Sequence, residues 1–412
     1  MESHTINGVE VFIIPFDKAR TVSCAFLIKK GSVHEPDELA GISHFIEHMA
    51  FRGTKNYDHF SLKYTVEVVG GNLNAFTDKL VTAYYAKVPE FHLEKTANVL
   101  KEITFHPIFS PEDTEIERKI ILEEYKMSQD DPTSKLFDTL IETVWPGAYG
   151  RPVIGREETI KRISAEDLRK YHRRNYNLSN TKIVLAGKVN NDSLKILERE
   201  LKNVRKGRKE KAQPSSPVFR YTDPKYIPRN DLEQVHIAVA KPVCGRNERD
   251  FYSLLVLNTA LGSGMSSILF HEIREKEGFV YEIFSQFYTL KETGVLLIYA
   301  ALSPEKIDEF MQKLREILSK EELFMRNFDY GKMRYLGKLE MITDNPSGVM
   351  SFVIDNVTHD STETLEERVE KIKSVSLGDY RKAFERFITG KWSVFGIGPD
   401  SGKILERYNL IV

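Results

Sequence analysis

The chain has 412 residues, of which 41% are hydrophobic and 29% charged. This composition is typical of a globular protein and excludes fibrous and intrinsically disordered classes, and the length suggests two or three domains. The 59 basic and 60 acidic residues give a formal net charge of -1, so no general electrostatic attraction to nucleic acid or to an anionic membrane is expected.

Neither a membrane span nor a secretory signal is expected. The longest apolar run, 295–302, is far shorter than the roughly 20 residues of a spanning helix. Residues 1–16 lack the basic start and the apolar run of a signal peptide. The two cysteines, Cys24 and Cys244, cannot make a disulfide framework or a thiolate zinc site. We therefore expect a cytoplasmic protein.

The first 203 residues show apolar patterns of both periods, which predict mixed secondary structure. In chain order we expect strands over 8–15 and 21–29, helices over 39–52 and 58–69, strands over 71–77 and 81–88, helices from 89 to 145 and over 164–175, a strand over 181–186 and a helix over 191–203. Helix starts are indicated by Pro89-Glu90 and by Ser110-Pro111.

A basic and then Pro/Ser-rich stretch, 202–217, interrupts this pattern. Its composition is typical of a solvated linker. Contact with nucleic acid is the alternative, but no aromatic residues are interleaved with the basic ones. We place a linker at 204–230, between an N-terminal domain at 1–203 and a C-terminal domain at 231–412.

The second half repeats the order of elements of the first. A strand at 234–240 is followed by helices near 247–261 and 266–276, by strands over 281–290 and 295–302, and by a helix pair that opens at Ser303-Pro304. The repetition is in element order and not in residue identity. It predicts a duplicated α+β domain.

The strongest chemical signal is the segment His44-Phe45-Ile46-Glu47-His48. On a helix, His44, Glu47 and His48 project from one face. Two histidines four residues apart can ligate zinc through neutral imidazoles. Zinc lowers the pKa of a bound water to roughly 7, and Glu47 can then act as general base and proton donor. The alternative is a helix with three polar residues that pair locally.

A third ligand is expected in the helix that Pro111 opens. Glu117 and Glu124 are seven residues apart and share one face, whereas Glu123 points roughly 100° away from Glu124. Glu124 can serve as the ligand and Glu117 can orient a ligating histidine. From spacing alone, an acidic helix surface explains these glutamates equally well.

With these motifs in place, the chain resembles the inverted-zincin metallopeptidases, which include pitrilysin, insulysin and the mitochondrial processing peptidases. The resemblance rests on HFIEHMAFRGT at 44–54 and on Glu117-Arg118 through Glu124. It favours Glu124 over Glu123 as third ligand and implies the orienting role for Glu117. It also implies one Zn²⁺ per chain, and a fold of two homologous domains, each a mostly antiparallel sheet backed by helices.

Two further segments extend the resemblance. Residues 70–77 look like the family's strand beside the zinc, which implies that Asn74, Ala75 and Phe76 bind a peptide as an added strand. Residues 274–281 look like its R-x-x-x-G-x-x-Y segment, which implies that Arg274 and Tyr281 hold the substrate or its tetrahedral intermediate. By themselves, these segments are also compatible with an ordinary hairpin and with residues that only pack.

The resemblance implies a zinc endopeptidase that cleaves peptides or unfolded segments inside a chamber enclosed by two chains. Because this chain carries both the zinc motif and the Arg/Tyr segment, we expect a homodimer. The alternatives are a non-catalytic or heterodimer-dependent partner subunit of a processing peptidase, a zinc amidase that acts on small molecules and, more remotely, a nucleic-acid-binding protein.

Overall fold

The computed structural model describes residues 1–16, 18–207 and 215–412, and the chain forms two compact units. Unit 1 consists of the described residues of Met1–Met127, Arg151–Pro214 and Met341–Thr364. Unit 2 consists of Ser128–Gly150, Ser215–Glu340 and Leu365–Val412. Part of the predicted linker, residues 208–214, lies outside the described residues.

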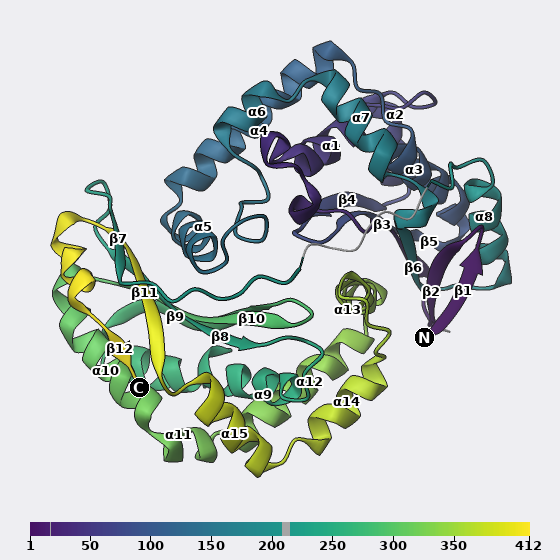
Figure 1. Ribbon diagram of the computed structural model, residues 1–412. Helices are drawn as coiled ribbons and strands as arrows, with labels where there is room; N and C mark the ends of the chain where they lie inside the picture. Colours follow the sequence, from purple (N-terminus) through teal and green to yellow (C-terminus); the bar gives the residue numbers. More distant parts are fainter. Residues whose placement is uncertain (17, 208–214) are drawn as a thin grey trace. The chain divides into compact units, whose positions relative to one another are not determined.

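Unit 1 contains a mixed sheet whose strands lie in the order β1-β2-β6-β3-β5-β4 (Figure 1). The strands are β1 (Glu2–Ile6), β2 (Val9–Pro15), β3 (Thr21–Ile28), β4 (Asn72–Thr77), β5 (Thr82–Pro89) and β6 (Thr181–Gly187). Every neighbouring pair is antiparallel except β2–β6. The strand β4 pairs with β5 on one side and forms an edge of the sheet.

Helices cover both faces of this sheet. They are α1 (Ile42–Ala50), α2 (His59–Glu67), α3 (Leu93–Phe105), α4 (Pro111–Asp130), α6 (Glu157–Arg162), α7 (Ala165–Asn175), α8 (Asn191–Leu201) and α13 (Pro346–Thr358). In β3, Val22, Cys24, Phe26 and Ile28 pack into the main core of unit 1. Ser23, on the opposite face, contacts Ser347 of α13 at 3.1 Å. The alternation of side chains along β3 therefore gives each face its own cover.

Unit 2 repeats this sheet, with strands in the order β12-β11-β8-β10-β9 and with β7 parallel to β11. The strands are β7 (Lys225–Pro228), β8 (Val235–Cys244), β9 (Val280–Thr289), β10 (Thr293–Leu302), β11 (Lys391–Gly398) and β12 (Leu410–Ile411). In both units a parallel pair (β2–β6, β7–β11) is followed by an antiparallel run (β3-β5-β4, β8-β10-β9). The predicted tandem duplication of an α+β domain is confirmed.

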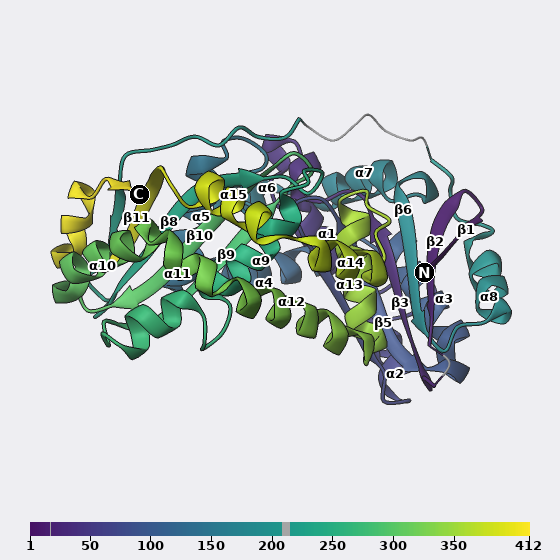
Figure 2. The ribbon, with the colours of Figure 1, turned by 90° about the horizontal axis from the view of Figure 1, so that it is seen from below.

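The helices of unit 2 also lie on two faces. They are α5 (Pro132–Val144), α9 (Phe251–Gly262), α10 (Ile307–Ser319), α11 (Glu321–Arg326), α12 (Phe328–Thr343), α14 (Leu365–Ser374) and α15 (Leu377–Phe387), with a π-helical turn, η5, at Phe270–Glu275. Figures 1 and 2 show α9, α10, α11 and α15 on one face of the strands, and α5 lies on the other.

The two halves of the sequence exchange one helix each. Helix α5 lies in the first half of the sequence but packs in unit 2, where Phe137 meets the ring of Tyr299 at 5.6 Å. Helix α13 lies in the second half but packs in unit 1, where Lys29 donates from Nζ to the carbonyls of Val357 and Thr358. The units therefore differ from the contiguous domains expected at 1–203 and 231–412, because each sheet buries its second face under a helix from the other half.

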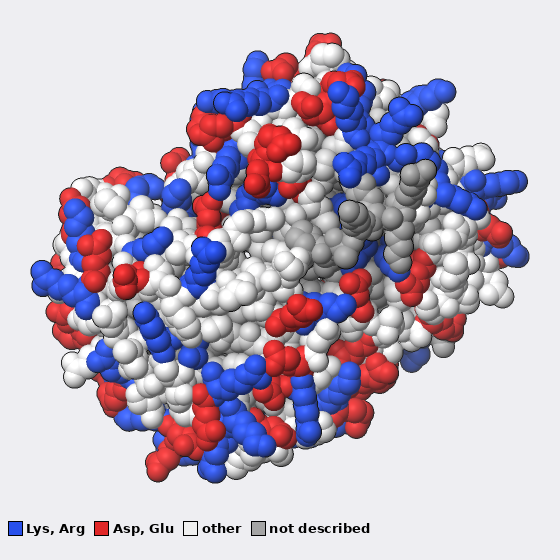
Figure 3. All heavy atoms as spheres, in the orientation of Figure 1, with Lys and Arg blue, Asp and Glu red and all other residues white. Residues whose placement is uncertain are grey.

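Charged side chains of both signs are scattered over the face of the protein shown in Figure 3, between areas of uncharged residues. Lys/Arg and Asp/Glu side chains are interspersed on that face, in keeping with the formal net charge of -1. Among the described residues, no helix combines the length and the apolar character that crossing a membrane requires.

Candidate metal centre

Helix α1 carries the two histidines of the motif, and its start is fixed by a buried carboxylate. Glu35 accepts hydrogen bonds from the backbone N–H groups of Gly41 and Ser43, both at 2.8 Å. Gly41 has a φ of +93°, and a Cβ there would lie 2.4 Å from the carbonyl oxygen of Ile154. Only glycine fits this position without strain, so this residue and Glu35 set where the helix with His44 and His48 begins.

Helix α4 brings Glu117 and Glu124 to α1. Ser110 caps the helix, because its hydroxyl oxygen accepts from the N–H of Asp113 at 3.0 Å. Arg118 ties the helix to the segment before α7, since it donates to the carbonyl oxygens of Ile160 and Ile163. The guanidinium of Arg118 also lies 5.5 Å from the centre of the Phe45 ring on α1. These contacts fix α4 against the helix of the motif.

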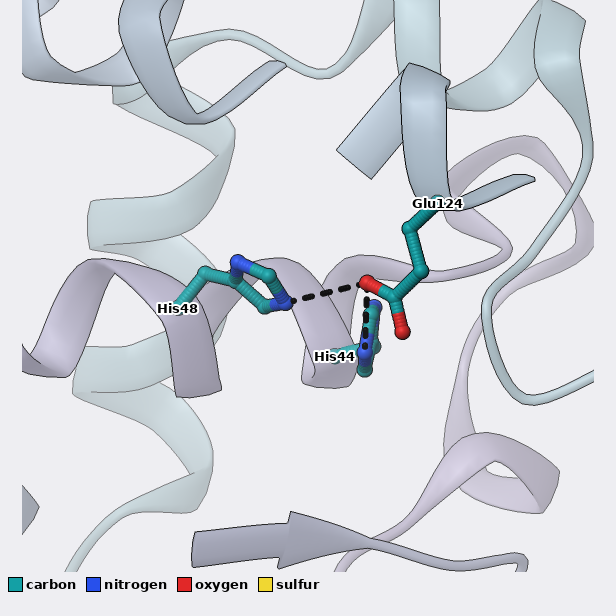
Figure 4. Close-up of side chains that lie close together, drawn as sticks. All are labelled: His44, His48 and Glu124. Atoms are coloured by element: carbon teal, nitrogen blue, oxygen red, sulfur yellow. Dashed lines mark ion pairs between the residues drawn. The ribbon is translucent and has the colours of Figure 1, made fainter. Parts of the chain in front are cut away.

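The side chains of His44, His48 and Glu124 converge on one point (Figure 4). Their possible ligand atoms all lie within 4.8 Å of one another. Glu124 Oε2 is 3.4 Å from His48 Nε2 and 3.8 Å from His44 Nε2. Ligands about 2.1 Å from a tetrahedral zinc ion are separated by roughly 3.4 Å. Two imidazoles and a carboxylate at these distances fit zinc, and Glu124 is half exposed, which leaves room for a water or a substrate.

Glu117 lies behind His48 and not at the convergence point. Its carboxylate accepts a hydrogen bond from His48 Nδ1 at 2.9 Å and is also paired with Arg52. A proton on Nδ1 leaves Nε2 of His48 free to face a metal ion. By contrast, Nδ1 of His44 is buried without a hydrogen-bond partner in the described part of the chain.

His44 and His48 have very different pKa values, because only His48 lies beside two carboxylates that outweigh its burial. Burial and the charge of His48 lower the pKa of His44 to about 4. Burial also acts to lower the pKa of His48, but hydrogen bonds and charges from Glu117 and Glu124 outweigh it and raise the pKa to about 9. A metal ion that binds His48 must therefore displace a proton, so affinity for the ion rises with pH.

Glu47 projects from α1 toward the end of β4. The hydroxyl of Thr77 donates to its Oε2 at 2.6 Å. Burial raises the pKa of Glu47, against the hydrogen bond from Thr77 and the charge of His48. A raised pKa makes this carboxylate a better proton acceptor than an exposed glutamate, which suits a general base beside a candidate metal site.

The predicted peptide-binding residues lie on the edge strand β4. Ala75 packs against the core of unit 1, and the Phe76 ring meets the Tyr85 ring edge-on at 6.1 Å. The exposed side chain of Asn74 accepts from the N–H of Ala75 at 2.8 Å. Because β4 has a paired neighbour on one side only, its free edge can accept another strand.

Arg274 and Tyr281 belong to unit 2. The guanidinium of Arg274 lies 4.6 Å from the centre of the Phe270 ring and 5.8 Å from that of Tyr281. Tyr281 is 74% exposed, so its hydroxyl is open to a ligand. Their predicted action on a substrate held at the metal stays a prediction.

Sequence reasoning missed three side chains that support this site. Arg52, which pairs with Glu117, lies four residues after His48 and just beyond the end of α1, and this spacing is a signal that could have found it. Thr77 meets Glu47 across 30 residues, and Glu35 caps α1 through a loop. Neither of these two contacts follows a helix or strand period.

Comparison with known proteins relates both halves of the chain to one family. Residues 11–157 match the family model described as Insulinase (Peptidase family M16), and residues 162–324 match that described as Peptidase M16 inactive domain. An uncharacterized zinc protease of Bacillus subtilis is 28% identical over 399 residues, or 95% of this chain and 97% of that protein. An uncharacterized zinc protease of Mycobacterium leprae is 32% identical over 318 residues, or 76% of this chain and 71% of that protein.

Solved structures share the whole fold. A protease from Helicobacter pylori superposes with a TM-score of 0.89 at 23% identity, covering 97% of this chain and 99% of that one. A peptidase M16 inactive domain from Pseudomonas fluorescens gives a TM-score of 0.88 at 16% identity, covering 97% of this chain and 98% of that one. At these identities the likeness concerns the architecture.

Proposed function

Because the chain belongs to the M16 family of peptidases, we propose that it is a zinc-dependent endopeptidase that hydrolyses peptides or unfolded segments of polypeptide. Relatives named zinc proteases support the metal and the substrate class. The observation that carries the proposal is the convergence of His44, His48 and Glu124 within 4.8 Å. Membership alone is insufficient, because one solved structure of this fold is described as an inactive domain.

The residues of unit 1 have separate roles in the proposed reaction. His44, His48 and Glu124 hold one zinc ion per chain, and Glu117 orients His48. When bound, the ion supplies Lewis-acid chemistry, activating a water molecule and polarising the scissile carbonyl. Glu47 takes the proton of that water at its carboxylate and delivers it to the amine that leaves. The hydroxyl of Thr77 holds the Glu47 carboxylate in place.

The substrate adds to the edge of β4. Backbone groups of residues 74–76 pair with the peptide, which gives affinity with little dependence on its sequence. Only an extended chain can pair in this way, so folded proteins are excluded and unfolded segments are accepted. Arg274 and Tyr281 supply a cation and a phenol hydroxyl that stabilise the oxyanion of the tetrahedral intermediate.

The assembly we propose is a homodimer in the cytoplasm that encloses a chamber for peptides. The reason for two identical chains is that one chain carries the metal ligands together with the Arg274 and Tyr281 segment. A chain that is inactive alone and gains activity only with a sister subunit is the alternative. The native mass of the purified chain, together with its peptidase activity in the absence of any other subunit, distinguishes the two.

Replacement of Glu47 by Gln tests the proposed function. The amide keeps the size of the side chain but cannot accept the proton, so the variant is expected to bind zinc as the wild type does and to lose at least about a hundredfold in peptide cleavage. Zinc content by mass spectrometry and turnover of a quenched fluorogenic peptide are the two readouts. Unchanged turnover removes Glu47 from its role.

A further inference from the structure

The duplication relates residues of α4 to residues of α12 by a constant offset. Helices α3 and α10 start at 93 and 307, and α5 and α13 start at 132 and 346. Both pairs differ by 214 positions (307 − 93 and 346 − 132), and the two helices of each pair have the same length. Residues 93–144 therefore align on 307–358 without a gap.

This offset places Lys338 where unit 1 has the metal ligand Glu124, and Gly331 where it has Glu117. The helix at the place of α1 is α9, whose sequence FYSLLVLNTALG contains no histidine and no acid. A Cβ on Gly331 would lie 2.7 Å from the carbonyl oxygen of Val256, so α12 approaches α9 closely there. Unit 2 has thus lost every metal ligand and has a cation in the place of one.

A second cation lies one helical turn from Lys338. Arg334 packs over the turn that follows α9, where a Cβ on Gly264 would lie 2.3 Å from its guanidinium. Lys338 donates from Nζ to the hydroxyl of Ser263 at 2.6 Å. Both cations are exposed. Within the described chain, neither forms an ion pair with a carboxylate.

The end of α9 uses only part of the hydrogen-bonding capacity of this pair, because Lys338 bonds the hydroxyl of Ser263 there. Cations near a helix C-terminus are favoured by the helix dipole and can bond its last carbonyl groups, but in the described chain neither side chain donates to a carbonyl of α9. Like charges four residues apart on a helix repel each other. Burial and the charge of Arg334 lower the pKa of Lys338. Because no carboxylate of the described chain pairs with either side chain, the positive charge of the pair is not neutralised within the fold.

We propose that Arg334 and Lys338, beside Gly264, form a site in unit 2 that binds a carboxylate of the peptide substrate. The inference rests on the proposed function. The anionic groups of an unmodified peptide are its C-terminal carboxylate and the side chains of Asp and Glu, so the ligand is a carboxylate from one of these sources. The planar fork of Arg334 can take both carboxylate oxygens, and Lys338 supplies a point charge.

Peptides that differ only in charge test this site. One fluorogenic peptide is made as a free acid, as a C-terminal amide, and as a free acid with its Glu replaced by Gln. A hydrogen-bonded charge pair contributes enough for a roughly tenfold change in KM. We expect the wild type to show that rise for the peptide that lacks the recognised carboxylate, with kcat unchanged. The peptide that shows the rise identifies the source of the carboxylate.

Variants test whether Arg334 and Lys338 cause the difference in KM between the peptides. Lys338→Met and Arg334→Gln are expected to remove the difference between the peptides by raising the KM of the better one, and Lys338→Arg is expected to restore it. The matched control is Lys382→Met, which removes an exposed charge of unit 2 from α15 and should keep the difference. Thermal midpoints should be the same for both Lys→Met variants, since a merely structural role of Lys338 would lower its midpoint.

Equilibrium binding separates this inference from the proposed function. In the Glu47→Gln background, anisotropy of labelled peptides reports affinity without cleavage. A tenfold preference that Lys338→Met abolishes supports the site even if the wild type cleaves no peptide. Equal affinity for all three peptides, no binding, or the same preference in Lys338→Met and Lys382→Met overturns it.

Discussion

Glu117 contacts His48 and lies away from the point where His44, His48 and Glu124 converge. Its carboxylate accepts from His48 Nδ1 and pairs with Arg52, and these two contacts hold the pKa of Glu117 below its ordinary value despite burial. Once His48 gives up a proton, its contact with Glu117 favours the tautomer with the proton on Nδ1, whose Nε2 faces Glu124 and His44. At the scale of single residues, the quality of the site depends on such neighbours as much as on its ligands.

Replacement of Glu117 by Gln should therefore weaken zinc binding by roughly 10- to 100-fold, because the amide is a poorer acceptor and loses the pairing with Arg52. The matched control is Glu123→Gln, since Glu123 lies on the same helix but pairs with Lys126 at the surface. Competition with a chromophoric chelator measures both affinities. Equal affinities for the two variants contradict the orienting role.

Thr77 offers a second test at this scale. Thr77→Val removes the hydroxyl that donates to Glu47 while keeping the shape of the side chain, so kcat is expected to fall roughly tenfold with zinc content unchanged. Thr77→Ser restores the donor and should restore kcat. A valine variant with wild-type kcat shows that Glu47 needs no such support.

At the scale of elements, helix α1 places both histidines, and its start depends on one glycine. In Gly41→Ala, the alanine would have to adopt a φ of +93°, and its Cβ would lie 2.4 Å from the carbonyl oxygen of Ile154. We expect a loss of at least about 2 kcal/mol of stability, together with weaker zinc binding. Gly8→Ala is the control, because Gly8 has a φ of +85° with nothing within 4 Å of its Cβ; it should cost about 1 kcal/mol. Urea denaturation measures the free energy of unfolding of both variants. Equal losses would show that the close approach to the carbonyl oxygen of Ile154 does not contribute.

His172 on helix α7 makes the stability of the protein depend on pH. Burial lowers the pKa of His172 to about 4, against its hydrogen bond to the carbonyl of Thr104. A histidine with a depressed pKa in the folded state contributes stability above its unfolded pKa of 6.5, and this is lost as the pH falls toward 4. From about pH 7.5 to pH 5 the loss is about 2 kcal/mol.

His172→Gln removes this titration but keeps a donor for Thr104. The unfolding free energy of the variant should fall less than that of the wild type over the same pH interval, by about 2 kcal/mol. Urea denaturation at the two pH values gives the difference. Identical pH dependence in both proteins contradicts the lowered pKa of His172.

Local periodicity predicts most elements of this fold, because α1, α4 and β4 each follow a helix or strand pattern over their own lengths. It also puts Glu124 and Glu117 on one face of α4, but the choice of Glu124 over Glu123 as third ligand comes from the family resemblance. It does not predict Glu35 or Thr77, whose contacts are made by loops and strand ends. The exchange of α5 and α13 is equally hidden, since which sheet face an apolar helix covers depends on partners more than 90 residues away.

At the scale of the whole molecule, this exchange ties the two halves of the sequence together. A fragment of residues 1–203 carries α5 without the sheet that it covers and lacks α13, which covers β3 and β6. We expect this fragment to expose apolar surface, to bind a hydrophobic dye and to unfold without a cooperative transition. The full chain is the control. Cooperative unfolding of the fragment, with zinc bound, contradicts the requirement for α13.

X-ray absorption at the zinc edge is the direct test of a metal ion held by His44, His48 and Glu124. In the zinc-loaded protein, we expect two imidazole nitrogens and carboxylate or water oxygens at about 2.0–2.2 Å, and no sulfur. His44→Ala should lose one imidazole from the spectrum, and Glu123→Gln should lose nothing. A sulfur ligand, or a spectrum that His44→Ala and Glu124→Gln leave unchanged, contradicts the proposal that His44, His48 and Glu124 hold the metal.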